Sequence, residues 1–220
     1  MAQKQNKTDL AYEAIRRKIL SNDYPPGTSL SERDLSEQLS ISRTPVKDAL
    51  KRLHFEGYVD ILPDRGAVVS KIGLSDTLEL YEIREALEGH FVRLAAERRR
   101  PEDLEQMTYH LKMHRQMFAE GAYDNTEYED AFHIDLAKAS FNQRLVSYLD
   151  CIIRQCGRTT VLHNRHSAQR IARSIEQHQV ILDAVCDGDA DRAEQAMRAH
   201  LEDVIESTKV LLRDFYFLYK

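Results

Sequence analysis

A single stretch, residues 31–53, constrains the fold of this chain most strongly, because it predicts two short helices joined by a tight turn. Ser31 is placed to cap the first helix, where Leu35 and Leu39 repeat at helical spacing. Ser42 is placed to cap the second helix, and a proline is tolerated in its first turn, where no intrahelical N–H bond is needed. Such a pair is either a helix-turn-helix or an ordinary helical hairpin with a solvated basic face.

The second helix of this pair has the composition that a DNA-reading helix requires. Its apolar residues form one stripe, which leaves basic and hydroxyl-bearing side chains at its N-terminal tip and on its other faces: Arg43, Thr44, Lys47, Lys51 and Arg52. A helix with such an N-terminus can enter the major groove of duplex DNA. The spacing therefore favours a recognition helix.

The flanking segments extend this pair to a winged helix. An amphipathic helix is predicted over residues 8–21, followed by a turn rich in proline and glycine. After the pair, residues 58–62 and 67–70 are predicted as two short strands around a turn. Arg65 and Gly66 at the hairpin tip suit a wing that contacts the minor groove or phosphates, although a plain surface turn is the alternative.

Beyond residues 72–74, the predicted linker, the sequence shows no strand signal. About six helices are predicted instead: 75–98, 101–121, 123–140, 143–157, 167–187 and 190–215. The expected fold class is mainly α. An N-terminal winged helix-turn-helix with a small β-hairpin wing occupies residues 1–72, and an all-α helical bundle occupies residues 73–220.

Composition and charge agree with two domains of different character. Residues 1–72 carry a charge balance of +2 and the remainder −7, so an N-terminal domain can bind phosphate locally although the chain totals −5. No apolar run approaches the roughly 20 residues that span a bilayer, and no N-terminal apolar segment resembles a secretory signal. The three cysteines are too few for a disulfide framework. We therefore expect a cytoplasmic protein with no membrane partner.

A second chemical signal lies in the helical half. Glu129 and His133 are four residues apart, on one face of one predicted helix. His178 and His200 have apolar helical neighbours and are expected to face inward from two other helices. Three imidazoles and a carboxylate that converge would suit a divalent transition metal with open coordination positions.

Alternatives to this set stay open at this point. Each histidine can instead be an unrelated core residue with its own hydrogen bond. His110 and His114 are a rival pair without a nearby carboxylate, and Asp130 is the fallback carboxylate. His163 and His166 fall in a predicted loop.

Nearly the whole chain, residues 10–210, resembles a known family. The stretches SRTPVKDALKRL and PDRGAVV are similar to the winged-helix domain of GntR-family transcription regulators. The stretches EDAFHIDLAKASFNQRL and EQHQVILDAVCDGDADRAEQAMRAHL are similar to the FCD effector domain of the FadR-like subgroup. The resemblance implies a transcriptional repressor, not an enzyme, that binds double-stranded operator DNA with a palindromic sequence as a homodimer.

The resemblance also implies DNA-binding roles for particular residues. These are Arg33, Ser42, Arg43, Thr44, Lys47, Arg65 and Gly66. The position of Lys47 is usually arginine in the family, and lysine lacks the bidentate fork that reads guanine. A phosphate contact is the alternative role for Lys47.

In the helical domain, the family's metal ligands are an aspartate, a histidine four residues later and two further histidines. They correspond to Glu129, His133, His178 and His200, where glutamate in place of aspartate is a departure. The resemblance implies zinc, with nickel or manganese as alternatives, and a small-molecule effector, a carboxylate, that completes the coordination.

Two further residues are assigned to the effector. Arg84 is expected to clamp the effector's carboxylate or to form an ion pair with Glu88, and Asn142 is expected near the pocket or at a helix N-cap. Two rival functions remain: a metal-dependent helical enzyme, and a regulator whose metal is purely structural.

Overall fold

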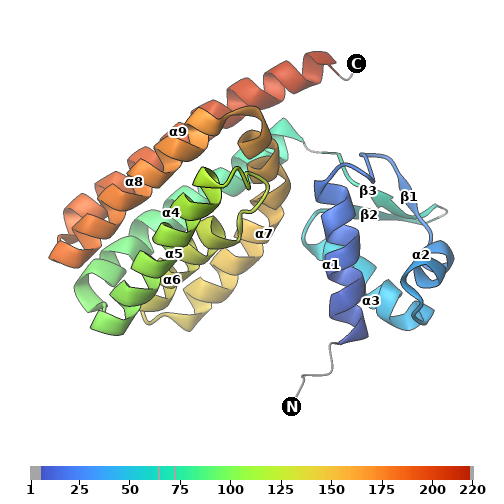
Figure 1. The fold of residues 1–220 in the computed structure, drawn as a ribbon, viewed down its shortest axis with the longest axis horizontal. Coiled ribbons are helices and arrows are strands. Elements are labelled where there is room, and N and C mark those ends of the chain that lie inside the picture. The colour runs from blue at the N-terminus through green and yellow to red at the C-terminus, as the bar shows by residue number, and fades with distance from the viewer. Residues whose placement is uncertain (1–5, 64, 72, 219–220) are drawn as a thin grey trace. The chain divides into compact units, whose positions relative to one another are not determined.

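The protein is described here by a computed structural model that covers residues 6–63, 65–71 and 73–218, with the side chains of residues 74 and 214–218 left undescribed. The chain divides into two compact units, Met1–Ile72 and Gly73–Lys220 (Figure 1). Part of the predicted linker, Ile72, and one residue of the predicted wing turn, Asp64, lie outside the described residues.

The first unit has the element order of a winged helix. Its helices are α1 (Lys7–Leu20), α2 (Glu32–Leu39) and α3 (Arg43–Phe55), and its strands are β1 (Ser29–Leu30), β2 (Val59–Leu62) and β3 (Gly66–Val69). The strands form an antiparallel sheet in the order β1-β3-β2, in which Val59 pairs with Val69 and Leu30 with Ala67. The predicted hairpin is confirmed, whereas β1 was not expected, because two residues carry no periodic signal.

Local sequence explains where the two central helices begin and end. The Ser31 hydroxyl accepts a hydrogen bond from the Asp34 amide at 3.3 Å, which caps α2 as predicted. Ser40 then adopts a left-handed conformation and ends α2. Gly57 follows α3 at a φ of +73°, a conformation that glycine adopts without strain, and turns the chain into β2.

The core of this unit forms where the apolar face of α1 packs against α3 and the sheet. Its members are fully buried: Ala11, Tyr12, Ile15, Val46, Ala49, Leu50, Leu53, Tyr58 and Val59 among them. Tyr12 donates a hydrogen bond to the buried Glu56 carboxylate at 2.5 Å, and the Arg52 guanidinium lies 3.7 Å from the Tyr12 ring centroid. This network joins α1 to the C-terminal end of α3 and satisfies the polar groups buried there.

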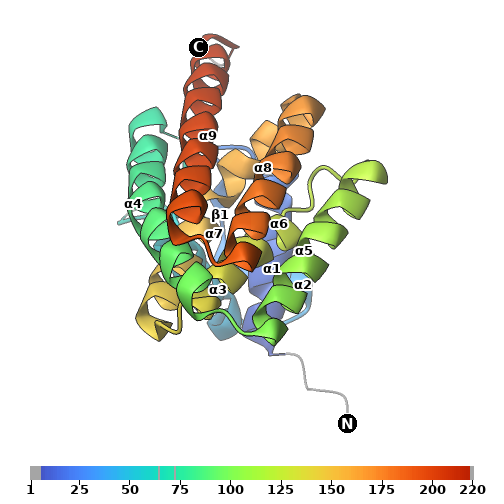
Figure 2. The ribbon, with the colours of Figure 1, turned by 90° about the vertical axis from the view of Figure 1, so that its left-hand side faces the viewer.

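The second unit is an all-α bundle, as predicted. Its helices are α4 (Leu74–Arg98), α5 (Pro101–Ala119), α6 (Glu127–Ala139), α7 (Gln143–His166), α8 (Ala168–Asp187) and α9 (Ala190–Leu218). The longest helix, α9, lies between α4 and α8 (Figure 2). Gly188, at a φ of +76°, ends α8 and lets α9 return antiparallel to it.

The prediction for α7 was wrong at its C-terminal end. The helix continues through Gly157 to His166, so His163 is a buried helical residue and does not lie in a loop. A glycine inside a helix costs only about 1 kcal/mol relative to alanine, and packing of the surrounding buried residues outweighs that cost. The helix α6 also begins four residues later than expected, at Glu127.

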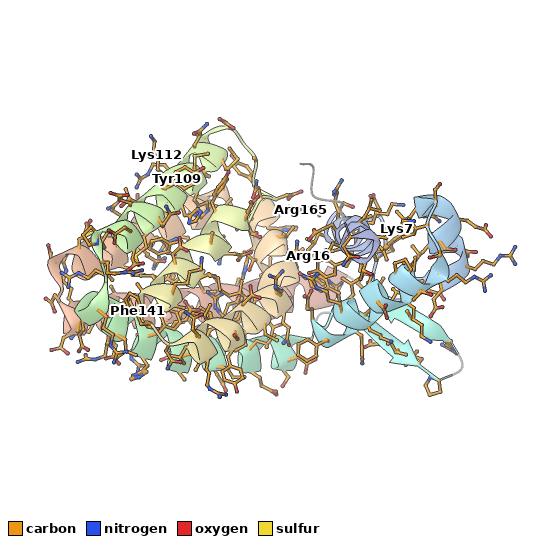
Figure 3. All side chains as sticks on the ribbon, turned by 90° about the horizontal axis from the view of Figure 1, so that it is seen from below. Lys7, Arg16, Tyr109, Lys112, Phe141 and Arg165 are labelled. Carbon is orange, nitrogen blue, oxygen red and sulfur yellow. The ribbon has the colours of Figure 1, made fainter. Side chains whose placement is uncertain are left out.

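The bundle buries one large apolar cluster together with several polar side chains. Phe91, Phe132, Leu136, Ile181 and Met197 are fully buried in it. On the outer side of α5, the side chains of Tyr109 and Lys112 project away from the bundle (Figure 3). Within the described residues, no helix combines the length and low polarity that crossing a bilayer requires.

Candidate DNA-binding face and buried histidine site

The buried stripe of α3 decides which of its residues face solvent. Because Val46, Leu50 and Leu53 pack inward, the predicted DNA-binding residues of this helix are left exposed: Ser42, Arg43, Thr44 and Lys47. Ser42 occupies the N-cap position with extended backbone, but its side chain makes no capping hydrogen bond. The N-terminal tip of α3 therefore offers two hydroxyls and two cations at the surface.

The remaining predicted DNA contacts are also on the surface. The Arg33 side chain on α2 is 70% exposed and pairs with Glu37 at 3.0 Å. An exposed pair of this kind contributes little to stability, so it can open in favour of a phosphate. Arg65 and Gly66 are exposed at the turn between β2 and β3, and Gly66 has a φ of +68°.

In the second unit, three predicted metal ligands come together. One ring nitrogen from each of His133, His178 and His200 lies within 4.8 Å of the others, and all three residues are at most 2% exposed. The Nε2 atoms of His178 and His200 are 3.3 Å apart. The histidines come from α6, α8 and α9, and they are the metal-competent group among the described residues.

Neighbouring side chains orient two of these rings. The Nδ1 atom of His133 lies 2.5 Å from Glu88 Oε2, and the Nδ1 atom of His200 lies 2.9 Å from Gln177 Oε1. Because each contact uses Nδ1, the Nε2 atom of that ring stays available to ligate a metal ion. The Nδ1 atom of His178 is buried without a hydrogen-bond partner. A carboxylate or amide behind each ligating imidazole is the usual arrangement around a metal, because it sets the tautomer and the ring orientation.

Burial disfavours the charged form of two of these histidines, His178 and His200. Burial lowers the pKa of His178 well below its usual value, and proximity to His200 lowers it further. Burial and proximity to His133 likewise lower the pKa of His200. Neutral imidazole is the form that ligates a metal ion, so the residues present fit a divalent cation with nitrogen ligands.

Glu129 lies one turn before His133 on α6 and is 6% exposed, but it is outside the group of three nitrogen donors. Ser174 donates a hydrogen bond to its Oε1 atom at 3.4 Å. Burial opposes ionisation of Glu129, but nearby His114 and Arg170 outweigh it and hold its pKa at about 2. The carboxylate is thus charged and close to the histidines.

Asp130, the fallback carboxylate, has a different environment. Thr126 donates a hydrogen bond to its Oδ2 atom at 3.0 Å. Burial and the neighbouring Glu129 raise the pKa of Asp130 to about 7. A carboxyl group that protonates this readily is a poorer metal ligand than Glu129.

The two residues assigned to the effector are placed differently. Arg84 is buried and donates from Nε to Glu88 Oε1 at 2.5 Å, the ion pair that was the alternative. Through Glu88 it supports His133. Asn142 is exposed and accepts a hydrogen bond from the Leu145 amide at 3.3 Å, so it caps α7.

The rival pair on α5 does not form a site of its own. His110 Nδ1 lies 2.5 Å from Asp135 Oδ2, so the expectation that no carboxylate is near it was wrong. His114 is buried elsewhere, with its ring centroid 6.1 Å from that of His178. The two histidines therefore face different surroundings although they are one turn apart.

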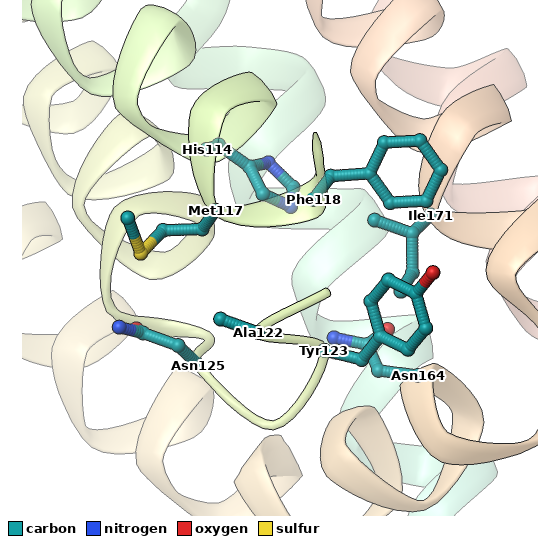
Figure 4. A pocket seen from close by; sticks show the side chains of 8 residues that line it. All are labelled: His114, Met117, Phe118, Ala122, Tyr123, Asn125, Asn164 and Ile171. Atoms are coloured by element: carbon teal, nitrogen blue, oxygen red, sulfur yellow. The ribbon is translucent and has the colours of Figure 1, made fainter. Parts of the chain in front are cut away.

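Sequence reasoning missed the residues that surround the cluster. Gln177 and Asn164 were not named at all, and Glu88 and His114 were named in other roles; Glu88 and Gln177 contact two of the histidines, and His114 and Asn164 line a pocket (Figure 4). One signal was present in the sequence: Arg170 precedes His178 by eight residues, which places both on one face of α8.

This arrangement defines a transcriptional regulator in which a winged-helix DNA-binding domain precedes an all-helical domain with a buried polar site. Residues 7–69 match the bacterial regulatory proteins of the gntR family, and residues 79–203 match the FCD domain. The chain belongs to the GntR family and carries an FCD domain.

Named relatives and solved structures agree with this assignment. The chain is 28% identical to the transcriptional repressor RspR of Escherichia coli over 92% of this chain and 89% of RspR. It is 30% identical to the regulator LutR of Bacillus subtilis over 84% of this chain and 94% of LutR. The fold is similar to that of E. coli McbR/YncC, with a TM-score of 0.77 at 22% identity over 96% and 99% of the two chains.

Proposed function

We propose that this protein is a ligand-responsive repressor. It binds a palindromic operator as a homodimer in the cytoplasm, and a small organic acid bound at a metal site in the helical domain changes its affinity for DNA. The name of the relative RspR, a transcriptional repressor, supports repression as the direction of control.

The DNA-reading half of the proposal rests on α3. Arg43 and Thr44 read base edges from the tip of this helix, whereas Lys47 contacts phosphate, since an ammonium lacks the fork that recognises guanine. Arg33, Ser42 and the wing contact the backbone and the minor groove. A dimer presents two such helices to two half-sites, so that protein symmetry matches operator symmetry.

The sensing half rests on the three convergent imidazoles, the observation that carries the proposal. His133, His178 and His200 would hold the ion, zinc first and nickel or manganese as alternatives, with Glu129 as the fourth protein ligand. A bound ion would supply a Lewis-acidic position for the effector's carboxylate. Glu88 and Gln177 hold the two rings they contact in the orientation that keeps Nε2 available.

The acid controls DNA binding only if it binds the DNA-competent and DNA-incompetent arrangements with different affinities. A coupling of about 1–3 kcal/mol changes operator occupancy by about 5–150-fold. Neither step needs a chemical reaction. A regulator is therefore detected as a change in DNA affinity, whereas a metal-dependent enzyme would be detected by turnover of a substrate.

A gel shift with the promoter upstream of the protein's own gene tests the proposal. Metal-loaded protein should bind this DNA at moderate salt, and one of a panel of small acids should shift the affinity. No binding to any neighbouring promoter would contradict the regulator. Binding that no acid alters, with melting temperatures that respond to chelator alone, would identify the metal as purely structural.

A further inference from the structure

A narrow pocket lies beside the histidine cluster (Figure 4). The space between its walls is narrow: about 180 Å³ is free of atoms when open solvent is included, and none of it admits a water-sized sphere. His114 forms one wall, the connection between α5 and α6 forms another through Tyr123 and Asn125, and Asn164 of α7 faces them. The His114 ring also contacts the His178 ring, with centroids 6.1 Å apart, so the pocket adjoins the cluster.

Several buried polar atoms in this region have no hydrogen-bond partner. They are Nδ1 of His114, Nδ1 of His178 and Nε of Arg170. His114 is 3% exposed and His178 is fully buried. Leaving a buried polar atom without a partner is unfavourable, so several such atoms in neighbouring residues point to a polar ligand that satisfies them.

Arg170 is fixed at a distance from the cluster. It lies two turns before His178 on the same face of α8, which separates their Cα atoms by about 12 Å. Its Nη1 atom donates to Asn164 Oδ1 at 3.1 Å, and Asn164 is 2% exposed. Ser174 lies between the two residues and contacts Glu129. This face of α8 thus carries the Arg170 guanidinium at one end and the imidazole cluster at the other.

We infer that Arg170 and His114 recognise a second anionic group of the effector, which is therefore a short dicarboxylate. This inference rests on the proposed function, because it assigns the effector's first carboxylate to the three-histidine site. A guanidinium fork binds a carboxylate through paired, charge-assisted hydrogen bonds. An acid with one carboxylate would leave Arg170 Nε and His114 Nδ1 unsatisfied. Met117, Phe118 and Ile171 form the apolar wall of the pocket and would contact the carbon chain once the walls move apart to admit it.

Matched acids test the inference on metal-loaded, full-length protein. Calorimetric titrations compare succinate with butyrate and glutarate with pentanoate, pairs of equal carbon number. The wild-type protein should bind at least one dicarboxylate about tenfold more tightly than its partner. Arg170→Gln should remove this preference and keep the metal content. Arg173→Gln is the matched control, because Arg173 lies on the same helix, is 64% exposed and pairs with Asp203.

Each outcome is decisive. Equal affinity for the two acids of both pairs in the wild-type protein overturns the inference and leaves the proposed function standing. A preference that survives in Arg170→Gln overturns it as well, and Arg170→Met, which also removes the charge, repeats this comparison if the glutamine variant does not fold. Wild-type protein that retains no metal and binds none of the acids overturns the proposed function, and the inference with it.

Discussion

The two units of this protein place the side chains of their candidate sites in opposite environments. In the winged helix, Arg43, Thr44 and Lys47 are exposed and the core is fully apolar or paired, as in the contact between Tyr12 and Glu56. In the helical unit the three imidazoles of the candidate site are buried in the core itself. A surface that binds a large polyanion needs no cavity, whereas a site for a small ligand has to surround it.

This difference has an energetic consequence. Exposed cations remain hydrated in the free protein, so the DNA-binding face costs the winged helix little stability. Buried imidazoles and an unsatisfied guanidinium Nε lower the stability of the free helical unit until a ligand satisfies them. The comparison therefore predicts that the helical unit responds to metal, pH and acids, and that the winged helix responds to DNA and salt.

Removal of a metal ligand should have the largest effect. His178→Ala or His200→Ala should lower metal content at least about tenfold, because loss of a ligand exceeds the 10–100-fold cost of losing a residue that merely orients one. Elemental analysis after dialysis measures this. His110→Ala is the control, since His110 is paired with Asp135 outside the cluster. Full occupancy in both ligand variants would remove the site from the helical unit.

Acid should destabilise the metal-free helical unit. Burial and nearby Arg170 lower the pKa of His163 from 6.5 to about 4 in the folded protein. Because the unfolded chain takes up the proton first, stability is full above pH 6.5 and falls as the pH decreases toward 4, by at most about 3 kcal/mol from this residue.

Denaturant melts at several pH values measure that loss. His163→Asn should flatten the pH dependence below pH 6.5. His90→Asn, at an exposed position, is the control and should leave the pH dependence of stability as in the wild-type protein. If the stability of His163→Asn depends on pH as steeply as that of the wild-type protein, the buried imidazole is not the group that lowers stability in acid.

On the winged helix, Arg43→Ala should weaken operator binding by about 1–3 kcal/mol and relax the sequence preference. Lys47→Ala should weaken binding to all sequences alike and reduce the salt slope by about 1. Fluorescence anisotropy at several salt concentrations separates the two. Lys112→Ala, on the exposed side of α5, is the control (Figure 3). Operator affinity unchanged in Arg43→Ala would take this residue out of the DNA-reading set.

The smallest effect is expected in the core of the winged helix. Tyr12→Phe removes the hydrogen bond to the buried Glu56 and should cost about 1–2 kcal/mol of stability in this unit, with no loss of metal. Tyr24→Phe is the matched control, because Tyr24 hydroxyl bonds only exposed or half-buried partners, Lys18 and Gln38. Chemical denaturation followed by a probe in the winged helix measures the stability of both variants. Equal losses of stability would contradict a special contribution from the buried hydrogen bond between Tyr12 and Glu56.

Much of the winged helix could be predicted because its signals are local. Capping at Ser31, the apolar stripe of α3 and the Gly66 turn each lie within a few residues of the structure they specify. Periodicity alone therefore placed Arg43 and Lys47 on the outer face. The strand β1 escaped prediction because only its pairing with β3, about 40 residues away, makes it a strand.

In the helical unit, the sequence determined that His178 and His200 face inward, since each has apolar neighbours at helical spacing, and that His133 shares a helix face with Glu129. Whether the three rings meet depends on how α6, α8 and α9 pack, and no spacing along the chain records that. The same holds for Glu88 behind His133 and Asn164 beside Arg170, which are 45 and 6 residues away in sequence. Helices form through local hydrogen bonds, but a site built across helices exists only once tertiary packing brings them together.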